Sequence, residues 1–196
     1  TKVCALVNLL EDGKPIKMSK RAGNFVTLSE IIEAVGKDVI RFIMLTRRND
    51  QTLDFDFKKV TEKSKENPVF YVQYAHARCD SIFKSAKVLE EDVLPENLNL
   101  LTNENEIALI KFITFWPRVL ELAERNYEPH KICYYLIELA SNFHSLWSKG
   151  KDDNNIKFVL EGNHVLTNSR LSLVKAVALT LRKGLTLLSI EPIFEM

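Results

Sequence analysis

From Phe57 to the end of the chain, apolar residues recur at the three- and four-residue spacing of an α-helix, over segments too long to be strands. The spacing predicts long helices over residues 67–89, 105–125, 130–149 and 168–188. Long helices joined by short connections pack together as a bundle. The sequence therefore predicts a mainly α fold of four or five long helices.

Capping and breaking residues indicate where these helices begin and end. Asn67 can cap the first helix, with Pro68 at its first position. Pro117 should kink or divide the second, because proline lacks the N–H that a helix interior needs. Gly150 is expected to close the third helix, since glycine favours helix ends.

The first 57 residues follow a different pattern. Thr27 can cap a short helix over residues 28–35 that ends at Gly36, and a second, densely apolar helix should follow over 37–45 as a buried connector. Residues 53–57 alternate apolar and acidic side chains, which fits either a strand or an extended linker. We favour the linker.

Residues 3–10 have the composition of a buried strand, but no partner strand is evident nearby. A strand without a partner leaves its backbone N–H and C=O groups unpaired. We therefore expect residues 1–28 to be poorly ordered. We also expect the chain, which starts at Thr1, to be a fragment of a longer protein or to need a further domain.

Composition restricts the compartment and the kinds of partner. The chain has 196 residues, of which 46% are hydrophobic, and a formal net charge of +1, so any nucleic-acid contact must come from a local cluster of charges. Three widely separated cysteines without a CxxC spacing argue against a disulfide framework and a zinc site, and the four histidines show no metal-ligand pairing. No apolar run could span a bilayer. We expect a cytoplasmic protein without metal or membrane contact.

A short basic segment follows the Gly13-Lys14-Pro15 turn. Residues 17–21 carry three cations and a hydroxyl, and Gly23 follows closely, which suits a mobile loop around a polyphosphate. The spacing is not that of a P-loop. The plain alternative is a solvated basic loop.

Two pairs of residues have the chemistry of a single-stranded RNA pocket. Tyr74 and Arg78 lie four apart and share a helix face, as do Phe143 and Trp147. Aromatic rings stack on unpaired bases, and arginine binds base edges or phosphates. The alternative is that these aromatics belong to the core and that the arginine reaches into solvent. His144, close by, is expected to be a hydrogen-bonded helix residue.

Several of these segments resemble one family. The basic loop resembles the KMSKS-type loop of class I aminoacyl-tRNA synthetases, and residues 67–78 resemble the most characteristic helix of arginyl-tRNA synthetases. Residues 143–147 resemble a later helix of that family, and 184–196 resemble its C-terminal ending, although Ser189 replaces a usual glycine and 193–195 depart from the usual sequence. The resemblance implies an end of the catalytic domain over residues 1–57 and an all-α anticodon-binding domain over 58–196.

The resemblance also implies roles for single residues. Four residues would form the loop that faces ATP, with Lys20 the catalytic charge on the phosphates: Lys17, Met18, Ser19 and Lys20. Five would line the anticodon pocket: Tyr74, Arg78, Phe143, Trp147 and Met196. No metal ligand is implied.

In the full enzyme the implied reaction is the ATP-dependent attachment of arginine to tRNA(Arg), with Mg²⁺ bound to ATP and a monomer as the expected state. The His-x-Gly-His motif of the family is absent from this chain, so we expect the fragment alone to be inactive. The alternatives are a free-standing tRNA-binding helical module and a helical interaction protein without an RNA role. Another class I enzyme, such as the cysteinyl synthetase, fits residues 67–78 less well.

Overall fold

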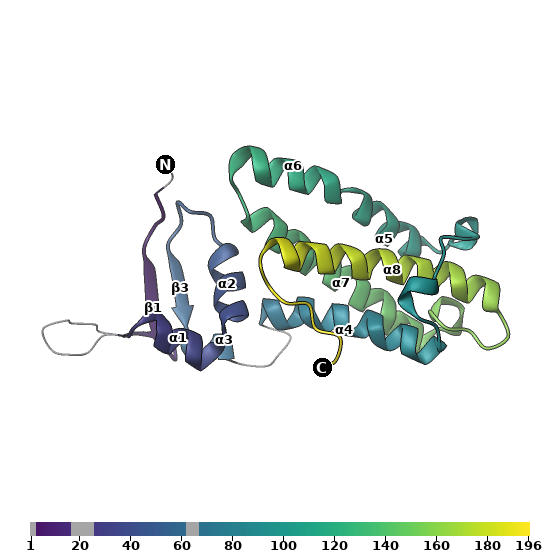
Figure 1. Ribbon diagram of the computed structural model, residues 1–196, viewed down its shortest axis with the longest axis horizontal. Coiled ribbons are helices and arrows are strands. Elements are labelled where there is room, and N and C mark those ends of the chain that lie inside the picture. The colour runs from purple at the N-terminus through teal and green to yellow at the C-terminus, as the bar shows by residue number, and fades with distance from the viewer. Residues whose placement is uncertain (1–2, 17–25, 62–66) are drawn as a thin grey trace, which may run out of the picture.

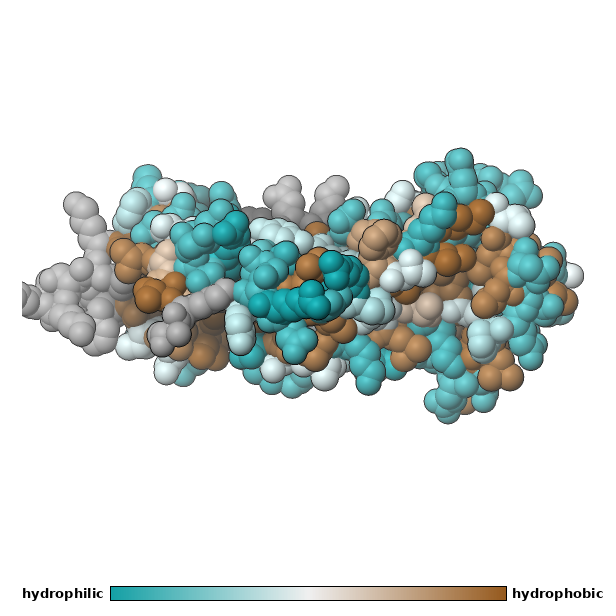
Figure 2. All heavy atoms as spheres, turned by 90° about the horizontal axis from the view of Figure 1, so that it is seen from above, coloured by the Kyte–Doolittle hydropathy of each residue, from teal (hydrophilic) through white to brown (hydrophobic). Residues whose placement is uncertain are grey.

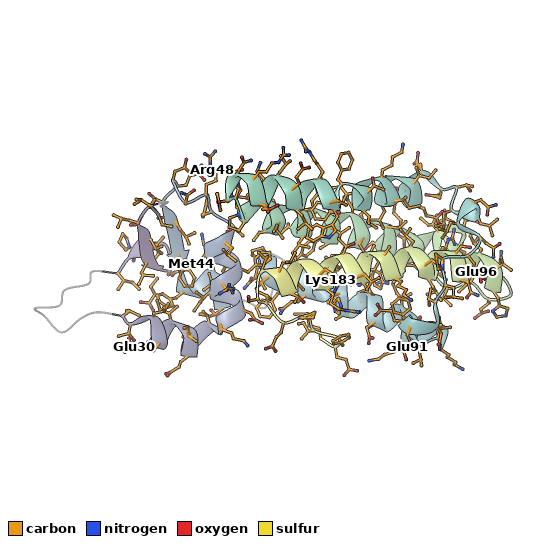
Figure 3. All side chains as sticks on the ribbon, turned by 45° about the horizontal axis from the view of Figure 1, so that its top comes forward. Glu30, Met44, Arg48, Glu91, Glu96 and Lys183 are labelled. Carbon is orange, nitrogen blue, oxygen red and sulfur yellow. The ribbon has the colours of Figure 1, made fainter. Side chains whose placement is uncertain are left out.

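The structure is a computed structural model that describes residues 3–16, 26–61 and 67–196. The molecule is elongated, with a small unit of strands and short helices at one end and a bundle of long helices at the other (Figure 1). Figure 3 shows Glu30 and Met44 in the small unit, and Glu91 and Glu96 near the far end of the bundle. The mainly α fold predicted from the spacing is confirmed.

The small unit contains a three-stranded sheet with the order β2-β1-β3. Strand β1 (Val7–Glu11) pairs antiparallel with β2 (Lys14–Pro15) and parallel with β3 (Leu53–Asp56). The two expectations for these segments were therefore wrong, because β1 has partners and residues 53–56 form a strand and not a linker. The parallel partner lies 46 residues further along the chain, as in the pair Val7 and Leu53, where local patterns cannot reveal it.

The burial of side chains on β3 shows which face of the sheet packs against the core. Leu53 is 6% exposed and Phe55 fully buried, so the apolar positions of the alternation point into the core of the small unit. The burial expected for β1 is wrong, since none of its residues is buried and Val7 is 39% exposed. The hairpin turn is held by Asp56, whose Oδ2 accepts the N–H of Gly13 at 2.7 Å.

Short helices cover the sheet (Figure 1). Helix α1 (Leu28–Val35) begins with the predicted Thr27 cap, which forms a capping box with Glu30, and α2 (Lys37–Leu45) follows Gly36 directly. Gly36 has φ of +86°, a conformation that favours glycine. Helix α3 (Phe57–Thr61) comes immediately after β3.

Five helices form the bundle: α4 (Pro68–Ala86), α5 (Glu104–Thr114), α6 (Trp116–Asn126), α7 (His130–Asp152) and α8 (His164–Leu187). Three 3₁₀ turns lie between them, η2 (Glu90–Asp92), η3 (Leu98–Leu100) and η4 (Asn154–Ile156). Helices α4, α7 and α8 pack against one another, and α7 also packs against α5 and α6. Figure 2 shows polar and apolar side chains interspersed over one face of the molecule.

The predicted helix boundaries agree in part with the structure. The cap at Asn67 is confirmed, and the division at Pro117 is confirmed because α5 ends at Thr114 and α6 begins at Trp116. Helix α7 continues past Gly150 to Asp152. A Cβ on Gly150 would lie 3.1 Å from the carbonyl oxygen of Ile156, so this glycine permits a close approach of the chain and does not end the helix.

The C-terminal tail, residues 188–196, contacts both the small unit and the bundle. The side chain of Gln73 on α4 donates to the carbonyl of Glu191 at 3.0 Å, and Lys37 on α2 forms an ion pair with the Glu191 carboxylate at 2.7 Å. His76 Nδ1 donates to the carbonyl of Ile193 at 2.7 Å.

The division of domains at residues 57 and 58 stays a prediction. None of the helices in the described ranges is long and apolar enough to cross a membrane.

Candidate nucleic-acid interface

Three of the residues predicted to bind RNA meet where α4 packs against α7. The guanidinium carbon of Arg78 lies 3.7 Å from the centroid of the Trp147 ring and 4.3 Å from that of Tyr74. Tyr74 and Arg78 share a face of α4, as their spacing predicts, and the contact of α4 with α7 adds Trp147. We call Tyr74, Arg78, His144 and Trp147 the Arg78 cluster.

Hydrogen bonds fix the arginine within this cluster. Arg78 Nη2 donates to the Tyr74 hydroxyl at 2.6 Å, and Nη1 donates to Nδ1 of His144 at 2.6 Å. Because arginine can only donate, His144 Nδ1 must be the acceptor, and the imidazole proton lies on Nε2. That nitrogen donates to the backbone carbonyl of Tyr71 at 3.3 Å. His144 is thus a hydrogen-bonded helix residue, as expected.

The charge state of His144 supports this arrangement. Burial lowers the pKa of His144 to about 4, and the positive charge of Arg78 acts in the same direction, while the bond to the Tyr71 carbonyl opposes them. The imidazole is therefore neutral at physiological pH and free to accept the Arg78 hydrogen bond. Protonation below the lowered pKa would replace this acceptor with a donor beside a guanidinium.

The cluster is open to solvent on one side. Tyr74 is 42% exposed, and Arg78 and Trp147 are half-buried. The ammonium of Lys151, one turn along α7, lies 3.8 Å from the centroid of the Trp147 ring. Aromatic surface and two cations thus occur together within one exposed patch, a combination common in proteins that bind single-stranded nucleic acids.

Phe143 does not take part in this patch. It is fully buried and packs against Phe158, with ring centroids 5.7 Å apart, so the expectation that it lines an exposed pocket is wrong. Residues four apart on a helix differ by about 40° in direction, because the turn contains 3.6 residues. Phe143 therefore points beneath the segment that follows α7, whereas Trp147 lies at the margin of that segment.

Met196 is 60% exposed at the end of the tail. The residues before it are attached to α4, since the Phe194 ring lies 5.0 Å from that of His76 and Glu195 pairs with Lys84. Within the described ranges, no ring contact, hydrogen bond or ion pair joins Met196 to the Arg78 cluster. Its predicted contact with RNA stays a prediction.

The predicted ATP loop lies outside the described residues. Lys17, Met18, Ser19 and Lys20 all belong to the segment 17–25, so their roles, including the catalytic role of Lys20, stay predictions. In residues 3–16, 26–61 and 67–196, no group of three or more His, Cys, Asp or Glu side chains is arranged to hold a metal ion.

Sequence reasoning missed two features of the cluster. It singled out His144 as a hydrogen-bonded residue but not as the partner of Arg78, because the two are 66 residues apart. It also missed Lys151, although the spacing of four from Trp147 on a helix was a signal that could have revealed it.

A family model covers most of the helical bundle. Residues 72–196 match the model described as the DALR anticodon binding domain, a segment that contains all but the first turn of α4 and the whole of α7. The chain belongs to the DALR anticodon binding domain family. Every residue of the Arg78 cluster lies within the matched DALR domain.

Curated relatives of the DALR chain are arginine–tRNA ligases. The protein of Wolbachia pipientis subsp. Culex pipiens is 51% identical over 191 residues, which are 97% of this chain and 33% of the relative. The protein of Azorhizobium caulinodans is 50% identical over 202 residues, which are 99% of this chain and 34% of the relative. The chain therefore spans about a third of the length of these relatives.

Solved structures share the fold of the DALR chain. A Campylobacter jejuni protein, provisionally described as an arginyl-tRNA synthetase, has a TM-score of 0.83 at 32% identity, with 97% of this chain and 39% of that chain covered. The arginyl-tRNA synthetase of Thermus thermophilus has a TM-score of 0.69 at 24% identity, with 96% and 34% covered, and shows the fold alone. The resemblance to the C-terminal part of arginyl-tRNA synthetases is confirmed.

Proposed function

We propose that this chain forms the C-terminal third of an arginine–tRNA ligase and that its DALR domain binds the anticodon of tRNA(Arg). The observation that carries the proposal is the Arg78 cluster, in which a guanidinium lies against two partly exposed rings within the matched domain. The lengths of the relatives support a longer protein around it. Val3 and Leu6, which are 81% and 79% exposed, are suitable for contact with the rest of that protein.

The geometry suggests how the cluster would bind an unstacked base. Arg78 lies over both rings, so a base would stack on the guanidinium plane, which the rings of Tyr74 and Trp147 support. Arg78 has five N–H donors, and its bonds to Tyr74 and His144 leave others for a base edge or a phosphate. Because the neutral His144 accepts from Nη1, the guanidinium is held in place before the RNA arrives. A base would thus meet a stacking surface and a fixed set of donors.

Replacement of Trp147 tests this proposal. We expect Trp147→Ala to weaken binding of an arginine anticodon stem–loop by about 1–3 kcal/mol, because the stacked arrangement of Arg78 on Trp147 is lost. The dissociation constant is measured by fluorescence anisotropy, for this stem–loop and for one with the central cytosine of the anticodon changed. Phe115→Ala is the control, since Phe115 is 60% exposed and lies outside the cluster. Equal effects of the two variants on RNA binding would refute the proposed site.

The second part of the proposal concerns the basic loop and ATP. We propose that Lys17, Met18, Ser19 and Lys20 bind the phosphates of Mg²⁺–ATP, with Lys20 stabilising the charge that develops when arginine is activated. The catalytic domain would hold arginine and adenine. This part is supported by the relatives, which are arginine–tRNA ligases.

In the full-length enzyme, we expect Lys20→Ala to lower arginine-dependent ATP–pyrophosphate exchange by about a hundredfold to a thousandfold, as for other lost electrostatic groups. Binding of tRNA should stay nearly unchanged. Lys14→Ala removes an exposed lysine of β2 next to the loop and serves as the control. Unaltered exchange together with weakened tRNA binding would reverse the assignment.

A free-standing RNA-binding module without catalysis is the second candidate. It is favoured by the location of the whole Arg78 cluster within residues 72–196, apart from the basic loop. Exchange activity in a protein that carries this chain would exclude it. For either function we propose a monomeric, cytoplasmic protein, and the unpaired thiols of Cys4, Cys79 and Cys133 agree with a reducing compartment.

A further inference from the structure

A cavity opens beside the Trp147 ring, between α4, the end of α7 and the segment after η4. Its volume is about 200 Å³, and its lining includes Trp147, Lys151, Lys157, Ser85 and Phe158. Trp147 belongs both to this cavity and to the Arg78 cluster, so the two sites share one ring.

The wall of the cavity is built from buried contacts. A side chain at Gly150 would approach the Cα of Lys157 to 3.3 Å, so the glycine lets this segment lie directly against α7. From the other side, Arg170 Nη1 donates to the carbonyl of Lys157 at 2.6 Å. Arg170 is itself 3% exposed. The segment that carries Lys157 is therefore fixed without any ligand.

The charge of the cavity is positive. Lys151 and Lys157 are both exposed, and the described part of the chain offers neither ammonium an ion-pair partner. Lys151 lies over the Trp147 ring, with its ammonium 3.8 Å from the ring centroid. A ligand that satisfies this site needs a flat ring for the indole and a negative charge for the two lysines. A nucleotide has both.

We propose that this cavity binds a second nucleotide of the RNA, with its base against Trp147 and its phosphate between Lys151 and Lys157. The proposal rests on the proposed function, since it places this nucleotide next to the one that the Arg78 cluster holds. Lys151 would leave the indole as the base arrives. A surface cation–π contact is weaker than base stacking, and the released ammonium can then bind the phosphate.

The dependence of binding on salt tests the phosphate contacts. For single-stranded nucleic acid, a plot of log association constant against log salt concentration has a negative slope. Each lost phosphate contact makes this slope less steep by about 0.7. We expect Lys151→Ala and Lys157→Ala in the 196-residue chain to weaken binding of the arginine anticodon stem–loop and each to make this slope less steep. Lys149→Ala is the matched control, because Lys149 lies in the same last part of α7 but bonds to Asn105 at 2.6 Å.

The base contact is tested with stem–loops that carry one abasic position at a time. At two loop positions, one for each site, loss of the base should reduce the effect of Trp147→Ala. Lys151→Ala should lose its effect when the base of the cavity is absent and retain it when the base of the Arg78 cluster is absent. A slope that becomes less steep to the same extent in Lys149→Ala would overturn the proposal, as would an unchanged slope in the lysine variants. If Trp147→Ala itself leaves binding unchanged, the proposed function fails; if only the lysine variants are silent, the second nucleotide site fails alone. Circular dichroism verifies that each variant is folded.

Discussion

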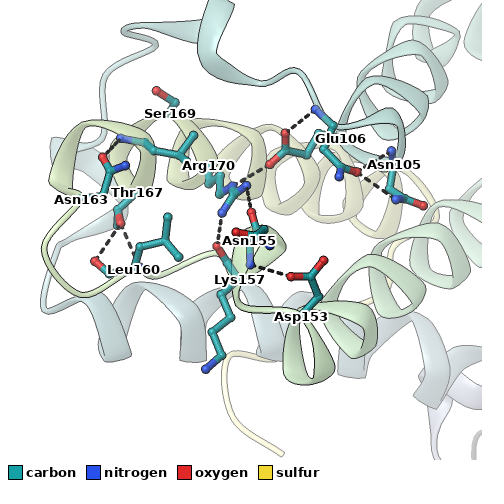
Figure 4. A network of polar contacts seen from close by, with 12 residues as sticks. Asn105, Glu106, Asp153, Asn155, Lys157, Leu160, Asn163, Thr167, Ser169 and Arg170 are labelled. Atoms are coloured by element: carbon teal, nitrogen blue, oxygen red, sulfur yellow. Dashed lines mark hydrogen bonds and ion pairs between the residues drawn. The ribbon is translucent and has the colours of Figure 1, made fainter.

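Arg170→Ala is expected to lower the free energy of unfolding by about 3–5 kcal/mol, because it leaves a buried carboxylate without its partner. Arg170 on α8 and Glu106 on α5 are 3% and 2% exposed, and Arg170 Nε lies 2.6 Å from Glu106 Oε1. Figure 4 shows how Arg170 lies between Glu106 and the backbone of Asn155 and Lys157. Urea denaturation followed by circular dichroism measures the loss.

The network around this pair explains the size of the effect. Arg170 also donates to the carbonyls of Asn155 and Lys157, and the other oxygen of Glu106 accepts the N–H of Asn103 at 3.2 Å in the cap of α5. One guanidinium thus connects α8, α5 and the segment after η4 (Figure 4). Truncation removes charge-assisted bonds from all three at once, and the unpaired groups cannot reach water.

Two controls separate burial of the ion pair from its charge. Arg118→Ala breaks a solvent-exposed pair with Glu121 and should cost less than about 1 kcal/mol. The double variant Glu106→Leu with Arg170→Met removes both charges and should recover part of the stability, since replacement of a buried pair by apolar side chains is often nearly neutral. If Arg170→Ala costs no more than Arg118→Ala, the pair does not hold these elements together.

The helices of this protein could be predicted from sequence because their signals are local. Thr27, Asn67 and Pro117 mark boundaries through the backbone groups of their own helix, and the structure agrees at each of them. The sheet could not be predicted in this way. The pairing of β1 with β3 joins segments 46 residues apart, as at Asn8 and Asp54, and neither strand alone indicates its partner.

In the candidate site too, contacts within one helix could be predicted and contacts between helices could not. Tyr74 and Arg78 share one helix, so their spacing alone placed them together. The bond from Arg78 to His144 depends on how α4 packs against α7, and local sequence patterns do not predict this packing. The buried pair of Glu106 and Arg170 was not singled out at all, because a charged residue in a helical pattern is normally placed on the solvent side.

Phe143→Ala is expected to cost about 3–5 kcal/mol of stability, as truncation of a buried phenylalanine does. The ring is fully buried and packs against Phe158 at 5.7 Å between centroids. Its removal leaves a cavity that the surrounding helices can fill only in part. Trp147 is half-buried at the margin of the same segment, so Trp147→Ala should cost less stability and more RNA affinity. Urea denaturation and the stem–loop titration give both quantities for each variant.

Phe143→Leu separates the core role from an RNA role, because leucine keeps most of the apolar contact but cannot stack on a base. We expect this variant to fold, to lose at most a small part of the stability that Phe143→Ala loses, and to bind the arginine anticodon stem–loop as the unaltered chain does. A ring that lined the RNA pocket would behave in the opposite way. If Phe143→Leu is as stable as the unaltered chain but binds RNA more weakly, Phe143 belongs to the pocket after all, and its burial in the free protein must change when RNA binds.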